Sequence, residues 1–409
     1  MSDLKHTTSI HKHCHGCHLP VTQPKLKNGQ SAICPRCRSL LYRGGEASLD
    51  GNLAIAITCL MLFLPSCYYH FIHIHLLGMD IKATLLTGIW GMFKADFDFL
   101  AIVVLFCSLI APLIVCASVI TAHYAFHKRS FRLLRNSMTA LKHMKHWMMI
   151  DVYLVSVAIA CFKLRDYADI FIGPALYCLV LLQILTILLI IRARPSQYWQ
   201  HWKHERNYQF EQFDYHCLEC NLSQPTGSHC ARCHAAQHKI KPNVFSHTWA
   251  YLLTALFALI PANYLAISVF TTNGQRAEDT IFSGITTLVG NGFYGIAAII
   301  FIASIAVPVA KVIGLLFILI VTHCWPHLWQ KERMAIYFVV KWIGKWSVMD
   351  LFVISIMMTL IDRGQILNFM PGIGAVAFAF VVIFTMLAAE SFDPRVIWGY
   401  SQTNTQHGK

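Results

Sequence analysis

Long apolar stretches separated by polar segments dominate this chain. Most are roughly 17 to 25 residues long, the length a helix needs to cross about 30 Å of hydrocarbon. The third and seventh stretches are short and carry polar residues, so the pattern leaves their ends open. The pattern predicts an all-α polytopic membrane protein with about eight spans, at about 51–72, 99–122, 148–162, 170–191, 249–270, 293–322, 346–361 and 372–389.

Composition agrees with the apolar pattern. Hydrophobic residues make up 56% of the 409 residues and charged residues only 13%. A soluble protein of this length needs more charge to cover its surface. The composition therefore excludes an ordinary soluble enzyme or binding domain.

Positive charge is distributed unevenly between the two sides of the predicted membrane. The polar N-terminus has no signal-peptide pattern, so we expect it to stay in the cytoplasm. Of the 33 Lys and Arg, 26 then fall in the cytoplasmic segments 1–50, 123–146, 192–246, 323–345 and 391–409. This is the positive-inside bias. It accounts for the net charge of +13 without a nucleic-acid partner.

The second half of the chain repeats the first. An offset of 196 superposes Cys34 on Cys230 and Pro112 on Pro308 without a gap, and beyond a loop of different length an offset of 199 superposes Asp151 on Asp350. With an even number of spans per unit, the halves are parallel repeats related by an axis along the membrane normal. The predicted divisions are a ribbon at 1–48, a membrane unit at 49–195, a linker and ribbon at 196–245, a membrane unit at 246–391 and a cytoplasmic tail at 392–409.

Between the first and second spans of each unit lies a segment too short to cross the membrane. These segments are Met79–Phe93 and Ala277–Val289, and both contain Thr-x-x-x-Gly. A short external or re-entrant helix and a simple loop both fit the pattern.

Eight of the fifteen cysteines form Cys-x-x-Cys pairs, and each unit is preceded by two pairs. Four thiolates in two knuckles are typical of a closed structural Zn²⁺ site, with iron in a rubredoxin-like site as the main rival. The other seven cysteines lie in or beside apolar runs, where packing explains them. The predicted ligands are Cys14, Cys17, Cys34 and Cys37 in the first ribbon and Cys217, Cys220, Cys230 and Cys233 in the second.

A lysine lies inside the sixth apolar run. Lys311 follows Pro308 by three residues, and its counterpart in the first half is Val115. An intramembrane cation by default marks a pathway or site, although a long side chain can also reach the interface. Ser304, seven residues earlier, lies on the same helical face. Pro112 and Pro308 would each free a backbone carbonyl, which water or polar neighbours must satisfy within a span. This favours a hydrated cavity near Lys311.

Three further polar residues are candidates for the same cluster. Asp151 and Asp350 open the third span of each unit, where a carboxylate either stabilises a helix N-terminus or pairs with Lys311. Thr385 lies in the middle of the last span. No phosphate-binding loop, nucleophile elbow or His-Glu-x-x-His motif occurs, so no catalytic residue is predicted and the chain is not expected to be an enzyme.

The chain resembles the paraquat-inducible protein A (PqiA) family of Gram-negative inner membranes over almost its whole length. The resemblance rests on the duplicated ribbons and units, the repeated Trp-x-x-x-Asp, the block from Ser304 to Lys311 and the closing Glu390-Ser-Phe-Asp-Pro-Arg-Val-Ile-Trp398. The segments Asn273–Gly284 and Gly88-Ile-Trp90 are most similar to the LetA branch.

The resemblance implies an inner-membrane subunit that loads or unloads phospholipid for a periplasmic MCE-domain tunnel. It also implies a substrate cavity among the spans. Two other hypotheses remain: a membrane redox protein that uses its Cys-x-x-Cys pairs, and a scaffold that only anchors its partner.

Overall fold

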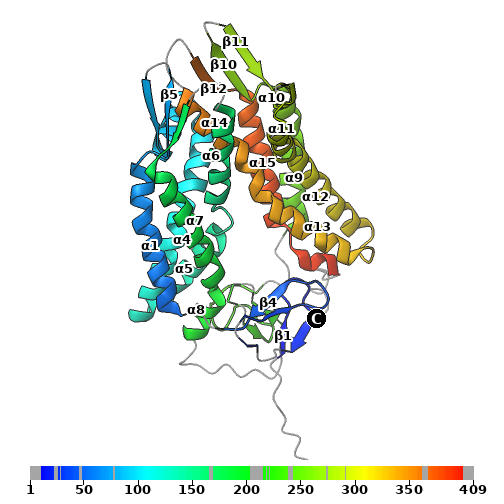
Figure 1. The fold of residues 1–409 in the computed structure, drawn as a ribbon. Helices are drawn as coiled ribbons and strands as arrows, with labels where there is room; N and C mark the ends of the chain where they lie inside the picture. Colours follow the sequence, from blue (N-terminus) through cyan, green and yellow to red (C-terminus); the bar gives the residue numbers. More distant parts are fainter. Residues whose placement is uncertain are drawn as a thin grey trace, which may run out of the picture.

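The computed structural model describes most of the chain. The described residues are 11–22, 26–27, 29–45, 48–76, 79–164, 169–202, 215–217, 219–220, 222–237, 243–272, 275–290, 292–361 and 367–398. Two helical units stand side by side, with small sheets at one end and the cysteine-rich ribbons at the other (Figure 1). The predicted helical class is confirmed, but small β-sheets accompany the helices.

Within the described residues, six helical segments are long and apolar enough to cross a membrane. Four are the outer helices of the units, and they pack in pairs, α1 against α7 and α9 against α15. Their bounds are Leu49–Tyr68 for α1, Pro174–Arg192 for α7, Val244–Tyr264 for α9 and Ile373–Ser391 for α15.

The other two long segments are continuous helices interrupted by a π-helical turn. In the first, α3 (Asp98–Leu105) passes through η1 (Phe106–Ile110) into α4 (Ala111–His127). In the second, α11 (Tyr294–Phe301) passes through η3 (Ile302–Ala306) into α12 (Val307–Cys324). The residue after each turn bonds five residues back, and a proline follows. Such turns insert an extra residue and often occur at functional sites.

The predicted third and seventh spans are shorter than a membrane-crossing helix. They are α6 (Ile150–Leu164) and α14 (Met349–Ile361). An amphipathic helix precedes each one: α5 (Phe131–Met144) packs against α4, and α13 (Gln330–Ile343) packs against α12 and leads through η4 (Gly344–Val348) into α14. Eight crossings are therefore compatible with the structure, although within the described part of the chain only six helical segments have the full length.

At the end opposite the ribbons, each unit carries a three-stranded antiparallel sheet. A hairpin between the first two long helices pairs with a strand that follows the short apolar helix. The strands are β5 (Ile72–Leu76), β6 (Met79–Ala83) and β7 (Asp169–Ile172) in one sheet, and β10 (Ser268–Thr272), β11 (Gln275–Asp279) and β12 (Leu367–Pro371) in the other.

The segments Met79–Phe93 and Ala277–Val289, for which the sequence allowed either a short helix or a loop, each contain a strand followed by a helix. Each begins within a hairpin strand and ends in a short helix, α2 (Leu85–Lys94) or α10 (Ile281–Gly290). In α2 the cap is reciprocal: Thr84 Oγ1 accepts from the Thr87 backbone N–H, and the Thr84 backbone N–H donates to Thr87 Oγ1. This cap stops the strand and starts the helix.

The elements repeat with the predicted offsets. Strand β5, turn η1 and helices α2 and α3 recur 196 residues later as β10, η3, α10 and α11. Helices α5 and α7 recur 199 residues later as α13 and α15. The offset changes in the connection Trp325–Trp329, between α12 and α13. The tandem duplication is thus confirmed element by element, and α1–α7 is called unit 1 and α9–α15 unit 2 below.

The two units meet through their short apolar helices. Helix α6 packs against α14, and the hydroxyl of Ser156 donates to the Met349 carbonyl at 3.0 Å. Both ends of this bond are buried. The centre of the molecule is therefore built from the two helices that are too short to span by themselves.

Each ribbon packs on the unit that it does not directly precede in the sequence, an arrangement called crossed packing below. The ribbon that precedes unit 1 packs on unit 2: its four cysteines share a buried cluster with Met334 and Tyr337 of α13, and the Arg36 guanidinium lies 4.4 Å from the Trp398 ring centroid. The remaining element bounds are β1 His11–His13, β2 Pro20–Thr22, β3 Ser31–Ile33, β4 Leu40–Arg43, α8 Pro195–Trp202, β8 Tyr215–His216, β9 Ser223–Gln224 and η5 Pro394–Trp398.

The second ribbon packs in turn on unit 1. Lys142 Nζ of α5 lies 2.6 Å from Glu219 Oε1, and the ring of Phe131 contacts that of His234 edge-on at 5.2 Å. Because α5 and α13 are equivalent helices, each ribbon contacts the corresponding helix of the unit that it does not directly precede.

Candidate metal centres and an intramembrane polar site

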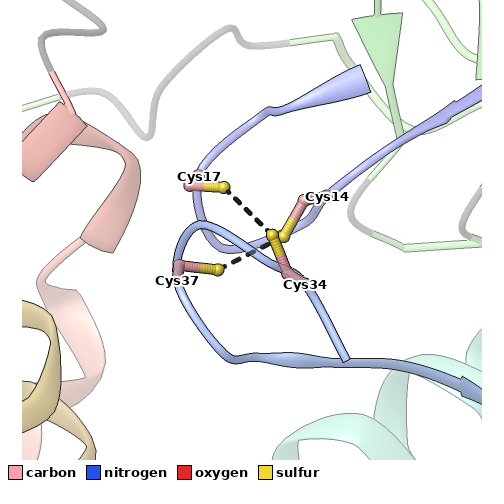
Figure 2. A group of neighbouring side chains, drawn as sticks. All are labelled: Cys14, Cys17, Cys34 and Cys37. Carbon is pink, nitrogen blue, oxygen red and sulfur yellow. Dashed lines mark hydrogen bonds between the residues drawn. The ribbon is translucent and has the colours of Figure 1, made fainter. Parts of the chain in front are cut away.

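The four cysteines of the first ribbon converge on one point. Their Sγ atoms all lie within 4.8 Å of one another. The Sγ atoms of Cys14 and Cys37 are 3.5 Å apart and those of Cys17 and Cys34 are 3.6 Å apart. Figure 2 shows the four side chains pointing toward one another. A tetrahedral zinc with Zn–S bonds of 2.3 Å would place its sulfurs about 3.8 Å apart. The donor set and its spacing therefore fit a metal ion of this size.

The second ribbon repeats this arrangement. Cys217 and Cys233 are 3.5 Å apart, as are Cys220 and Cys230, and all four thiols are buried. Both predicted four-cysteine groups are thus confirmed as clusters that could hold a metal ion. A closed set of four protein ligands would leave no open position for a substrate on the ion.

Local backbone geometry produces each knuckle. Cys14 N–H donates to the Leu19 carbonyl, and His18 N–H returns to the Cys14 carbonyl, both at 2.9 Å. The residue after the second cysteine adopts a left-handed conformation, as in His18, Arg38 and His234. The tight turn brings the two thiols of a pair to the same side. Glycine favours this conformation most, so these three residues carry a small backbone cost.

Close packing of the thiols also favours a thiolate. The contact with Cys14 lowers the pKa of the Cys37 thiol to about 3. In the second ribbon, the contact with Cys217 lowers the pKa of Cys230. Metal ligation requires the deprotonated form. In each cluster one thiol is thus stabilised as a thiolate by its neighbours, whereas the same kind of contact raises the pKa of Cys17 and of Cys220.

Lys311 is buried in the middle of a long helix. The continuous helix from Tyr294 to Cys324 places it about 26 Å from one end and about 20 Å from the other, at 1.5 Å per residue. Its side chain is 1% exposed. The ammonium therefore lies in the middle of this helix and is enclosed by the surrounding helices.

The described partner of this ammonium is a residue that the sequence analysis missed. Lys311 Nζ donates to Ser347 Oγ at 3.0 Å, and Ser347 is 1% exposed. Ser347 lies in η4, just before α14, so this short helix begins at the same depth as Lys311. The repeat could have revealed this pair: its counterparts in unit 1 are Val115 and Met148, so both positions are apolar in unit 1 and polar in unit 2.

Two other predicted residues lie in buried positions nearby. Ser304 is in the π-helical turn η3, and its hydroxyl is buried without a hydrogen-bond partner among the described residues. Its counterpart Ser108 donates to the Val104 carbonyl at 2.7 Å. Thr385 Oγ1 donates to the Val382 carbonyl at 3.0 Å, and Thr385 lines a small hollow together with Lys311.

The two aspartates occupy the first turns of the short helices. Asp151 of α6 and Asp350 of α14 are half-buried. The N-terminus of α6 sits beside the π-helical turn of unit 1, because Met149 N–H donates to the Cys107 carbonyl at 3.4 Å. Both carboxylates therefore belong to helix starts that lie against the middle of a long helix. Asp350 is three residues from Ser347, the partner of Lys311.

The fold and these sites define the class of protein. The described residues form a duplicated bundle with six helices of membrane-spanning length and a buried cation, and two four-cysteine clusters lie at one end. These features define a multi-pass membrane protein with two ribbons that could bind metal. The family described as Paraquat-inducible protein A matches residues 49–203 and again residues 245–402. The chain belongs to this family, and each of its two units matches once.

Relatives of known name cover almost the whole chain. Lipophilic envelope-spanning tunnel protein A of Escherichia coli is 36% identical over 95% of this chain and 91% of its own length. A probable intermembrane transport protein of Haemophilus influenzae is 34% identical over 94% and 95%. Intermembrane transport protein PqiA of Escherichia coli is 29% identical over 98% of both chains. No solved structure matches the chain significantly.

Proposed function

We propose that this chain is the membrane subunit of a lipid-transport system in the bacterial inner membrane. It loads or unloads phospholipid for a periplasmic MCE-domain protein that forms a tunnel toward the outer membrane. The relatives support this assignment, because they are named as intermembrane transport and envelope-spanning tunnel proteins. Both termini and both ribbons face the cytoplasm, in accordance with the distribution of Lys and Arg.

The observation that carries this proposal is the buried cation. Lys311 has three N–H donors, and its hydrogen bond to Ser347 uses one of them. An ammonium in a low-dielectric interior binds an anionic oxygen strongly, because a charge-assisted hydrogen bond there is roughly twice as strong as a neutral one. A lipid phosphate supplies such oxygens. Lys311 is therefore proposed to hold the headgroup, with the Ser304 and Thr385 hydroxyls close by.

The half-buried carboxylates are assigned a separate role. Asp151 and Asp350 sit at the starts of the two central helices, where protonation would remove a negative charge from each helix start. No nucleotide-binding motif is present, so proton movement is the proposed source of energy. The chain is accordingly a transporter subunit and has no catalytic residue in this proposal.

Both ribbons are proposed to hold Zn²⁺. Eight buried thiols in two tetrahedral groups suit zinc, which brings no redox chemistry of its own. A thioredoxin-like role needs an accessible thiolate. The convergence of all four sulfurs on one centre argues against this redox alternative.

Complementation of a transport-deficient strain tests the proposal. Lys311→Ala is expected to abolish lipid transport at normal protein levels, whereas Val115→Ala, at the equivalent position of unit 1, should retain it. Purification should recover two zinc ions per chain, bound phospholipid and the MCE partner. Full transport by Lys311→Ala would remove the buried cation from the mechanism.

A further inference from the structure

A groove on the outer surface of unit 2 leads to Lys311. It lies between α12 and α13, has a volume of about 240 Å³, and has no polar lining residue except Lys311. The side chain of Val339 on its wall is 53% exposed, whereas Lys311 is 1% exposed. The groove therefore runs from the lipid-facing surface to the buried ammonium. Its apolar walls include Val307, Ala310, Ile336, Val339 and Ile343.

The helix spacing explains why the groove is there. A Cβ on Gly314 would come within 3.0 Å of Val340 Cγ2 and 3.3 Å of Ile336 Cγ2, so α12 and α13 touch closely at this glycine. One and two turns toward the helix start, on the same face, the residues are Ala310 and Val307. There the helices leave the groove between them.

The equivalent helix pair in unit 1 is held together differently. Thr121 of α4 and Ser137 of α5 share a hydrogen bond of 2.8 Å between their hydroxyls. Their counterparts in unit 2 are Phe317 and Ile336, which cannot form one. The lysine position is Val115 in unit 1. In unit 2 a cation thus lies behind the apolar gap, whereas the equivalent position of unit 1 holds a valine.

Lys311 also lines a second hollow on its other side. The hollow includes Thr385 and Glu390 of α15 and Lys341 of α13. Lys311 and Val340 are common to both spaces. The ammonium thus lies between the apolar groove and a smaller hollow whose lining includes Thr385, Lys341 and Glu390.

We propose that the α12–α13 groove binds one acyl chain of a membrane phospholipid while Lys311 binds its phosphate. The groove is smaller than the 300–1,000 Å³ typical of a drug-sized pocket, so it holds part of one chain and not a whole lipid. Apolar walls around a single terminal cation complement an anionic amphiphile and no other common membrane component. Lipid enters sideways from the bilayer between α12 and α13. This inference rests on the proposed function and specifies its substrate position.

Photo-crosslinking in native membranes tests the groove. A benzophenone side chain at position 339 should capture phospholipid, detected as protein-bound phosphorus. Changing Lys311→Met should lower this yield by about tenfold, because the charge-assisted contact is lost. A benzophenone at position 313 provides the control: Ile313 is 60% exposed and does not line the groove, so its yield should not depend on Lys311. Equal loss, or no loss, at both positions would overturn the groove.

A bulky side chain in the groove tests lipid entry through the groove separately from the role of Lys311. Val339→Trp should reduce transport strongly at normal protein levels, and Ala140→Trp, at the equivalent position of α5, should not. If Val339→Trp transports fully while Lys311→Ala fails, the lateral groove is wrong and the lysine site stands. If both variants transport fully, the proposed function of this site fails with it.

Discussion

Unit 1 and unit 2 have the same fold but different chemistry. Both contain a long helix with a π-helical turn, a short central helix and a three-stranded sheet at the same end. In unit 1 the buried positions equivalent to Lys311 and Ser347 are Val115 and Met148, and the serine of the turn bonds its own helix. The two units thus share a scaffold, whereas the buried pair of Lys311 and Ser347 belongs to unit 2 only.

The ribbons follow an opposite rule. They have similar clusters and differ mainly in which unit they support, because each one packs on the unit that it does not directly precede. Unfolding of one ribbon should therefore affect the unit that it packs on, and not the unit that it directly precedes. The four predictions below test these two contrasts.

The largest effect is expected from loss of a ribbon cysteine. Structural zinc contributes about 10–16 kcal/mol in isolated zinc-finger peptides, so Cys37→Ser should unfold the first ribbon and lower the zinc content by one ion. Trypsin should then cut α13 of unit 2, at Lys331 or Lys341, faster than α5. Cys233→Ser should instead speed cutting of α5, at Arg132 or Arg135, because this helix loses the support of its ribbon. If either variant instead sped the cutting of the unit that its ribbon directly precedes, the crossed packing would be contradicted.

Exchanging the cation between units tests whether its surroundings matter. The double variant Lys311→Val with Val115→Lys restores the count of buried lysines but moves the charge to unit 1, where Met148 replaces Ser347. A charged residue at the bilayer centre costs about 2.5–3.5 kcal/mol by insertion measurements. We expect a lower thermal midpoint and no transport. Transport at the original rate would show that the two units are interchangeable.

A smaller effect is expected from the serine partner alone. Ser347→Met copies unit 1 and removes the hydrogen bond that Lys311 donates to Ser347. A hydrogen bond to a charged group contributes about 1.5–3 kcal/mol, so transport should fall by about tenfold or more while Lys311 remains in place. The reverse change, Met148→Ser in unit 1, should leave transport unchanged. A transport assay at matched protein levels distinguishes the two variants.

The smallest effect concerns the hydroxyl pair that holds α4 to α5. Ser137→Ala breaks the Thr121–Ser137 bond and should destabilise unit 1 by about 1 kcal/mol. Lipid transport should be almost unaffected, since the groove lies in unit 2. Thermal unfolding in detergent measures the stability change. If this variant instead gave unit 1 a lipid crosslink at position 140, hydroxyl pairing would be the feature that closes the groove.

Patterns local in sequence predicted the architecture well. Apolar runs located the long helices, the Cys-x-x-Cys spacing located both clusters, and a constant offset located the repeat, because each depends on residues close in the chain or on copying. The pattern failed where polar and apolar residues mix. Helix α5 looked like a cytoplasmic loop because of its basic residues, yet it packs along α4. The third strand of each sheet was missed because β7 and β12 pair with strands about 100 residues earlier in the chain.

At the polar site, too, the sequence identified Lys311 but not the residues that surround it. Hydropathy alone identifies a cation that must have a purpose in hydrocarbon, and comparison of the repeats marks it as unique to unit 2. Its partner Ser347 is 36 residues away, and the groove beside it depends on how closely two helices approach at Gly314. Such distances follow from side-chain packing between separate helices. Hydrophobicity and spacing along the chain therefore determine what can fold into the membrane, and tertiary packing determines which polar groups meet there.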